Sequence, residues 1–118
     1  MGRLTTHVLD TARGCAAAGV EIEVWGIADG DERRRLATAR TNAAGRTDAP
    51  LLEGAELTAG IYELVFFVGD YFASQEREMP SPPFLDRVPI RVGIADPGAH
   101  YHIPLLVSPW AYSTYRGS

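Results

Sequence analysis

The clearest indication of the fold comes from residues 100–107, His100-Tyr101-His102-Ile103-Pro104-Leu105-Leu106-Val107. Side chains of a β-strand point alternately to its two faces. One face would carry Tyr101, Ile103, Leu105 and Val107, and the other His100, His102, Pro104 and Leu106. The first face is the better core face because it carries no charged or titratable imidazole. We therefore predict a strand whose two histidines point away from the core, toward solvent or another subunit.

Other segments show related strand patterns. Val20–Trp25 and Val88–Ile94 alternate with a period of two residues, whereas Ile61–Val68 is apolar on both faces after Glu63, which favours a central strand. Weaker candidates of the same type are Leu4–Leu9 and Leu36–Thr41. Several short strands separated by regular turns predict an all-β protein with an antiparallel β-sandwich.

A single short helix is predicted over Asp70–Glu78. This segment lacks alternation, Asp70 could cap it, and Pro80 would end it. Pro89 and Pro104 fall inside predicted strands. Because proline has no N–H to donate, we expect the pairing of those strands to be interrupted on one side.

Length and composition limit the class of protein. The 118 residues predict one domain spanning 1–118, and 46% apolar residues are typical of a globular chain. The net charge of −4 disfavours nucleic acid as a partner, and we interpret the basic run Arg33–Arg35 as a solvated loop. A lone Cys15 excludes an internal disulfide. We see no signal peptide and no apolar stretch of about 20 residues, so we expect a cytoplasmic protein with no membrane partner.

The three histidines are the main candidates for chemistry. His100 and His102 could be ordinary exposed side chains, or they could serve acid–base catalysis, since the pKa of histidine lies near neutrality. Spacing alone does not decide between these two readings. A zinc site completed by His7 is a third alternative, although no cysteine or acidic residue lies close in sequence to support it.

His7 and Arg46 also have unremarkable interpretations. His7 could be a strand histidine bonded to Thr5 or Thr6, and Arg46 a surface cation paired with Asp48. Taken alone, the residues therefore indicate a β-sandwich whose C-terminal segment is rich in histidine and tyrosine.

Five segments of the chain resemble the 5-hydroxyisourate hydrolase branch of the transthyretin-like proteins. They are residues 4–10, 41–48, 83–90, 100–109 and 115–118. The most specific is Tyr115-Arg116-Gly117-Ser118, because hormone-carrying transthyretins resemble the rest but lack this ending. The likeness covers essentially the whole chain.

The resemblance implies a transthyretin-type antiparallel β-sandwich with one short helix. It also implies a homotetramer whose active sites lie between subunits. The implied reaction is hydrolysis of 5-hydroxyisourate, a small-molecule substrate, to 2-oxo-4-hydroxy-4-carboxy-5-ureidoimidazoline in urate degradation, with no cofactor and no metal.

The resemblance also assigns roles to individual residues. His7, Arg46, His102 and Ser118 match catalytic positions, and His7, Arg46 and Tyr115 match substrate-binding positions. We expect neutral His102 to be the general base and His7 to orient the water or donate a proton. Arg46 would hold the substrate's carbonyl and anionic groups, and Tyr115 and Ser118 would close the pocket.

Two neighbouring residues receive no catalytic role. His100 is expected at the pocket rim or in a structural role, and Arg116 could anchor the C-terminal segment by an ion pair.

The principal alternative is a small-ligand carrier of the transthyretin type without catalysis. It would not require His7, Arg46 and His102 together, so their joint presence with the terminal motif favours the enzyme. A zinc-dependent hydrolase would instead lose activity with chelators.

Overall fold

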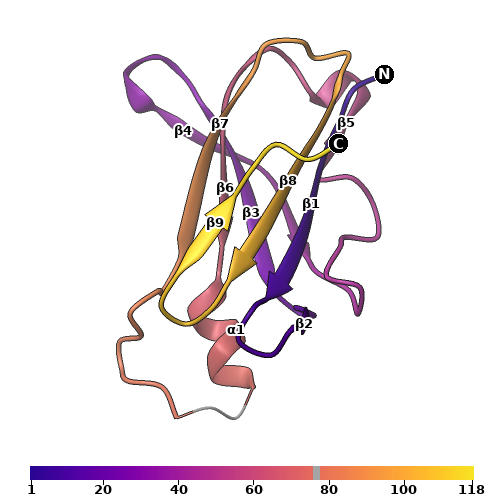
Figure 1. Ribbon diagram of the computed structural model, residues 1–118. Coiled ribbons are helices and arrows are strands. Elements are labelled where there is room, and N and C mark those ends of the chain that lie inside the picture. The colour runs from indigo at the N-terminus through magenta and orange to yellow at the C-terminus, as the bar shows by residue number, and fades with distance from the viewer. Residues whose placement is uncertain (76–77) are drawn as a thin grey trace.

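The computed structural model describes residues 1–75 and 78–118 as two β-sheets packed face to face, with one α-helix at their lower end (Figure 1). The first sheet contains β1 (Arg3–Asp10), β2 (Cys15–Ala16), β5 (Leu52–Glu53), β8 (His100–Val107) and β9 (Tyr112–Thr114). The second contains β3 (Glu21–Ile27), β4 (Arg33–Arg40), β6 (Gly60–Phe66) and β7 (Val88–Ile94). The α-helix is α1 (Val68–Ser74), and single 3₁₀ turns are η1 (Asp29–Asp31) and η2 (Gly54–Glu56). The predicted all-β sandwich with one short helix is confirmed.

The order of strands brings the two ends of the sequence together. The first sheet has the order β2-β1-β8-β9, with β5 paired to the start of β1, and the second has the order β4-β3-β6-β7. Neighbouring strands are antiparallel except β1 and β8, which run parallel along their whole length. Sequence patterns had not indicated this parallel pair, and it places the N-terminal strand directly beside the histidine strand (Figure 1).

The core lies between the sheets and has the composition expected from strand alternation. The largest fully buried side chains come from both layers and include Leu4, Val8, Leu105, Ile22, Leu64 and Phe66. Burial of each such side chain contributes about 1.5–3 kcal/mol. On β8 the predicted face is buried, whereas His100 is exposed and His102 is half-buried. The prediction that both histidines point away from the core is confirmed.

The helix begins earlier than predicted. It runs from Val68 to Ser74, with Phe67 at the N-cap position and Asp70 exposed in its first turn. Val68, Tyr71 and Phe72 are buried at helical spacing, so this apolar stripe determines the start. The expected strand 61–68 accordingly ends at Phe66. Residues 76–77 of the predicted helix lie outside the described residues.

Proline placement agrees with the expected interruption. Pro89 lies on β7, an edge strand of its sheet. Pro104 lies between the β8–β9 ladder at Leu105–Val107 and an isolated bridge joining His102 to Gly117. The missing N–H therefore divides the pairing of β8 with the C-terminal segment into two parts.

Two expectations about polar segments are corrected or extended. Arg33–Arg35 is part of β4 and not a solvated loop, because Arg33 pairs with Glu63 at 3.1 Å and Arg35 with Glu23 at 3.4 Å across the outer face of the sheet. Cys15 is a free, exposed thiol on β2. In the part of the chain that is described, no helix has the length and apolar character needed to cross a bilayer.

Candidate active site

The outward faces of β1 and β8 together carry a cluster of polar side chains, namely Thr5, His7, His100 and His102. The parallel register places Thr5 opposite His102 and His7 opposite Pro104. Thr5 and His7 alternate with the buried residues Leu4, Thr6 and Val8, so they share the outer face with the histidines of β8. Residues about 95 positions apart in sequence are thus brought into contact by a single strand pair.

The Thr5 hydroxyl joins the two histidines of this cluster by hydrogen bonds. Its Oγ1 lies 2.8 Å from Nδ1 of His102 and 2.8 Å from Nε2 of His100. Thr6 points the other way and donates to the carbonyl oxygen of Ile103 at 2.6 Å. The alternative in which Thr5 or Thr6 bonds His7 is wrong: among the described residues the Thr5 hydroxyl contacts the two histidines of β8, and Thr6 lies on the buried face of β1, opposite to His7.

Arg46 is brought to the same face by a tight turn over β1. The Asn42 side chain accepts hydrogen bonds from the backbone N–H groups of Ala44 and Arg46. Gly45 adopts a left-handed φ of 76°, and its carbonyl accepts the N–H of Val8 at 2.8 Å. A Cβ at Gly45 would lie 2.4 Å from the Val8 oxygen, so only glycine fits this close approach.

Asp48 does not pair with Arg46 as the simpler interpretation supposed. It accepts a hydrogen bond from Nδ2 of Asn42 at 3.0 Å, which stabilises the turn. Among the described residues, no salt bridge involves Arg46. The guanidinium is exposed and remains available to a ligand.

These elements enclose a cleft of about 330 Å³. Its walls are formed by β1, β8, the segment after the Arg46 turn and the C-terminal residue. The lining includes Thr5, Arg46, Asp48, His100, His102 and Ser118. Three of the predicted site residues, Arg46, His102 and Ser118, are therefore brought together in one cleft. His7 lies beside the cleft, under the Arg46 turn, where Cδ2 of its ring would be 3.3 Å from a Cβ at Gly45.

The electrostatics of the cleft favour neutral histidines. Burial lowers the pKa of His102 below its usual value, and the nearby charges of Arg46, His100 and His7 lower it further. Burial and the Arg46 charge also lower the pKa of His7, with a hydrogen bond to the backbone of Ala44 opposing the shift. Both imidazoles are therefore mainly uncharged at neutral pH, the form in which a histidine accepts a proton.

The C-terminal segment covers one edge of the histidine strand. The Gly117 N–H donates to the His102 carbonyl at 2.8 Å. The Arg116 guanidinium lies 4.2 Å from the centre of the Tyr101 ring, so a cation–π contact takes the place of the expected ion pair. Tyr115 is 59% exposed and lines a different cleft together with Ile90, Val92 and Tyr101. Within this chain, Tyr115 is not brought to the histidines.

A metal centre has no geometric support in the described part of the chain. No group of three His, Cys, Asp or Glu side chains there is arranged to hold an ion. The rings of His100 and His102 are 6.2 Å apart, with a hydroxyl between the ring nitrogens that face each other. The Thr5 hydroxyl thus occupies the position that a metal ion bound by both histidines would need.

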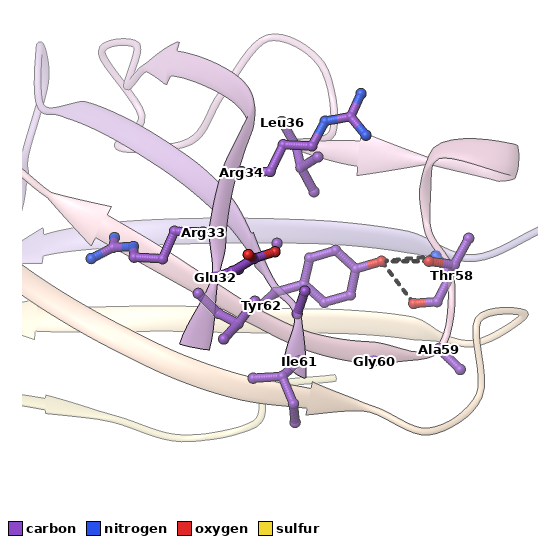
Figure 2. Close-up of a pocket in the computed structure, with 12 residues that line it drawn as sticks. Glu32, Arg33, Arg34, Leu36, Thr58, Ala59, Gly60, Ile61 and Tyr62 are labelled. Carbon is purple, nitrogen blue, oxygen red and sulfur yellow. Dashed lines mark hydrogen bonds between the residues drawn. The ribbon is translucent and has the colours of Figure 1, made fainter. Parts of the chain in front are cut away.

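A larger cleft of about 370 Å³ lies on the second sheet (Figure 2). Figure 2 shows the Tyr62 ring in its centre, with the hydroxyl bonded to the backbone of Thr58 and the side chains of Arg33 and Arg34 directed away from the ring. It holds no histidine, and Arg33 is already paired with Glu63. The cleft on β1 and β8 is therefore the better candidate for acid–base chemistry.

Solved structures of the same architecture define the class of protein. The chain is similar to (S)-allantoin synthase, with a TM-score of 0.92 and 46% identity over 99% of this chain, although it covers only 44% of that longer chain. It is similar to Klebsiella pneumoniae 5-hydroxyisourate hydrolase, with a TM-score of 0.81 and 37% identity over all of both chains. Transthyretin from Sparus aurata has a TM-score of 0.87 and 26% identity, covering 98% of this chain and 96% of that one. The fold is therefore a transthyretin-type β-sandwich.

Sequence comparison gives the particular family. The model of the HIUase/Transthyretin family matches residues 4–117, and the chain belongs to this family. A curated relative from Ralstonia nicotianae, 5-hydroxyisourate hydrolase, is 58% identical over the full length of both chains.

Sequence reasoning missed several polar residues that line the cleft, and among them Thr5 is the one that contacts both histidines of β8. Alternation along residues 4–9 places it on the same face as His7, but only the register of β1 against β8 shows that it contacts His102. That register depends on strands far apart in the sequence.

Proposed function

We propose that this protein hydrolyses 5-hydroxyisourate to 2-oxo-4-hydroxy-4-carboxy-5-ureidoimidazoline in urate degradation. One observation carries the proposal. A cleft in a member of the HIUase/Transthyretin family holds an unpaired guanidinium, judged among the described residues, beside a histidine whose pKa is lowered. Hydrolysis of a cyclic amide needs a base for water and a donor for the carbonyl oxygen, and these groups supply both.

The first step is attack of water on the amide carbonyl. Neutral His102 removes a proton from the water through Nε2 as the new C–O bond forms. Negative charge then develops on the carbonyl oxygen, and the Arg46 guanidinium stabilises it by charge-assisted hydrogen bonds. Such a donor typically contributes a factor of about 10²–10³ to turnover.

The second step breaks the ring. The C–N bond cleaves, and the ring nitrogen takes up the proton that His102 removed from water, delivered directly or through His7. The carbonyl carbon becomes a carboxylic acid, which releases its proton to solvent and remains as a carboxylate. Water is thereby added across the amide, and no cofactor or metal takes part. His7 lies next to Arg46, so it would orient the water or deliver this proton. Ser118 would close the cleft beside His102.

The proposed assembly is a homotetramer with active sites between subunits. The position of Tyr115 supports it, because this substrate-binding candidate lies outside the histidine cleft of its own protomer. Trp110 and Tyr112, near it in sequence, are 67% and 45% exposed, which is typical of aromatic residues that become buried at an interface. Tyr115 would therefore act in the cleft of a neighbouring subunit. The proposed location is the cytoplasm.

A carrier function is not favoured. A carrier would need an apolar ligand site, whereas the walls of this cleft are mainly histidine, arginine, threonine and serine. The high identity to a hydrolase over the full chain agrees with the enzyme.

The test follows the absorbance of freshly prepared 5-hydroxyisourate. The wild-type protein is expected to accelerate its loss equally with and without a chelator, and Arg46→Ala is expected to reduce turnover by about 10²-fold or more. Arg40→Ala is the matched control, because Arg40 is an exposed arginine on β4 that pairs with Glu21. A wild-type rate no faster than spontaneous decay would exclude the hydrolase, and loss of activity with chelator would favour a metal enzyme.

A further inference from the structure

Thr5 links the two histidines of β8 through one hydroxyl group. Its Oγ1 is 2.8 Å from Nδ1 of His102 and 2.8 Å from Nε2 of His100. A hydroxyl has one proton, so it can donate to only one of these nitrogens, and the other nitrogen must itself carry a proton and donate. The three side chains therefore share their hydrogens, and the tautomer of His102 is coupled to that of His100.

We propose that Thr5 and His100 are positioning residues that hold His102 with its proton on Nδ1. In this arrangement Nδ1–H of His102 donates to Thr5, and the Thr5 hydroxyl donates to Nε2 of His100. Nε2 of His102 is left unprotonated and serves as the base. The inference rests on the proposed hydrolysis and assigns a role to two residues that the catalytic assignment leaves unused.

The position of the His102 ring supports this direction of the hydrogen bonds. Gly117 covers its Cδ2 edge, and among the described residues Nδ1 is the ring atom that forms a hydrogen bond. Nε2 is therefore the nitrogen available to water in the cleft. Thr5 is opposite His102 in the β1–β8 register, so the backbone itself fixes the contact at Nδ1.

The catalytic cycle also favours this direction. When Nε2 accepts a proton, the imidazolium donates from both nitrogens, so the bond from Nδ1 to Thr5 persists unchanged. With the opposite direction, Nε2 would already carry a proton and could not act as the base. Each turnover would then require the hydroxyl to turn. His100 is exposed, so its own Nδ1–H is solvated at no cost to the arrangement.

The first experiment reads the tautomer directly. Ring ¹⁵N shifts are measured by NMR at a pH where the histidines are neutral, and the three histidines are assigned with His7→Gln and His100→Gln variants. We expect His102 to carry its proton on Nδ1 in the wild type and to shift toward Nε2–H in Thr5→Val. A wild-type His102 protonated on Nε2, or a tautomer unaffected by Thr5→Val, would overturn the proposal. This measurement needs no turnover, so its failure is distinct from failure of the hydrolase.

The second experiment measures kinetics. Thr5→Val is expected to lower kcat about 10- to 100-fold with little change in KM, and Thr5→Ser, which keeps the hydroxyl, should restore most of it. Thr38→Val, the same change at an exposed position of β4, is the control. Since Thr5 and His100 act as one unit, the double variant Thr5→Val/His100→Ala should be no slower than Thr5→Val alone. Additive losses, or a Thr5→Ser enzyme as slow as Thr5→Val, would contradict the role.

Discussion

Gly117 lies against the Cδ2 edge of the His102 imidazole. Its N–H donates to the His102 carbonyl at 2.8 Å, and a Cβ at position 117 would come within 2.6 Å of Cδ2 of the ring. The C-terminal segment therefore holds the catalytic candidate from one edge while Thr5 holds it from the other.

Gly117→Ala is expected to displace either the His102 ring or the C-terminal segment. A contact of 2.6 Å is too short for a real Cβ, so one of the two must move, and a misplaced catalytic group costs about 10²-fold in rate. Turnover of 5-hydroxyisourate and the melting temperature would be measured together. Gly93→Ala is the control, because a Cβ there meets Ile61 at an ordinary 3.6 Å. Equal activity of the two variants would contradict the positioning role of Gly117.

Gly45→Ala should disturb both stability and activity. Gly45 has a left-handed φ of 76° and a Cβ there would lie 2.4 Å from the Val8 oxygen. Gly30→Ala is a sharp control, since Gly30 has a similar φ of 73° with nothing within 4 Å of the added atom. We expect Gly30→Ala to cost about 1–2 kcal/mol of unfolding free energy and Gly45→Ala to cost more and to reduce turnover as Arg46 moves. Denaturant unfolding measures the difference.

The pKa of His102 should depend on the positive charge of Arg46. Burial, followed by Arg46 and the other histidines, lowers the pKa of His102, so its neutral form persists to pH values below the ordinary 6.5. The acid limb of kcat/KM is therefore expected below pH 6.5. Arg46→Gln removes a positive charge, so the pKa of His102 should rise. An NMR titration of the His102 ring follows this change even if turnover is lost, and a fall or no change in the pKa would show that Arg46 does not act on His102.

Tyr71 should make the fold sensitive to alkali. Its hydroxyl donates to the buried Asp10 carboxylate at 2.8 Å. Burial, together with this bond and the Asp10 charge, raises the pKa of Tyr71 to about 12. The unfolded chain loses this proton near pH 10, so the contribution of Tyr71 to stability is complete below pH 10 and is lost as the pH rises toward 12.

Tyr71→Phe is the corresponding variant. It should lower the free energy of unfolding by about 1–3 kcal/mol at neutral pH, because a buried carboxylate oxygen loses its hydrogen-bond donor. It should also reduce the loss of stability that the wild type shows as the pH rises above 10. Tyr62→Phe, which removes a buried tyrosine hydroxyl bonded to the Thr58 backbone instead of to a carboxylate, serves as control. Thermal unfolding between pH 7 and 11 gives both quantities, and an unchanged alkaline decline would show that another group causes it.

Local sequence patterns predicted the longer strands well, because alternation along a strand depends on neighbouring residues alone. Alternation gave the buried face of β8 and the outward direction of His100 and His102, and it located β7 with its observed bounds. The predicted start of α1 was wrong. The prediction used Asp70 as the capping residue, whereas the buried stripe of Val68, Tyr71 and Phe72 determines where the helix begins. The short β2, β5 and β9 were missed, since two or three residues carry no readable period.

The candidate site was predictable only in part. Arg46, His102 and Ser118 came from the family resemblance, and the structure gathers them in one cleft. Strand alternation alone could not place Thr5 beside His102, because the contact depends on a parallel pairing between distant segments. The pairing of Asp48 with Asn42 could not be predicted either, since a carboxylate two residues after an arginine has several possible donors in a tight turn.

The parallel pairing of β1 with β8 has a consequence for biosynthesis. Thr6 and Ile103, which are joined by a hydrogen bond, are 97 residues apart. During translation β1 leaves the ribosome long before its neighbour exists, so one edge of it stays unpaired while most of the polypeptide is made. A chain whose synthesis stops before β8 cannot form the histidine cleft, so hydrolysis is expected only after β8 has been made and has paired with β1.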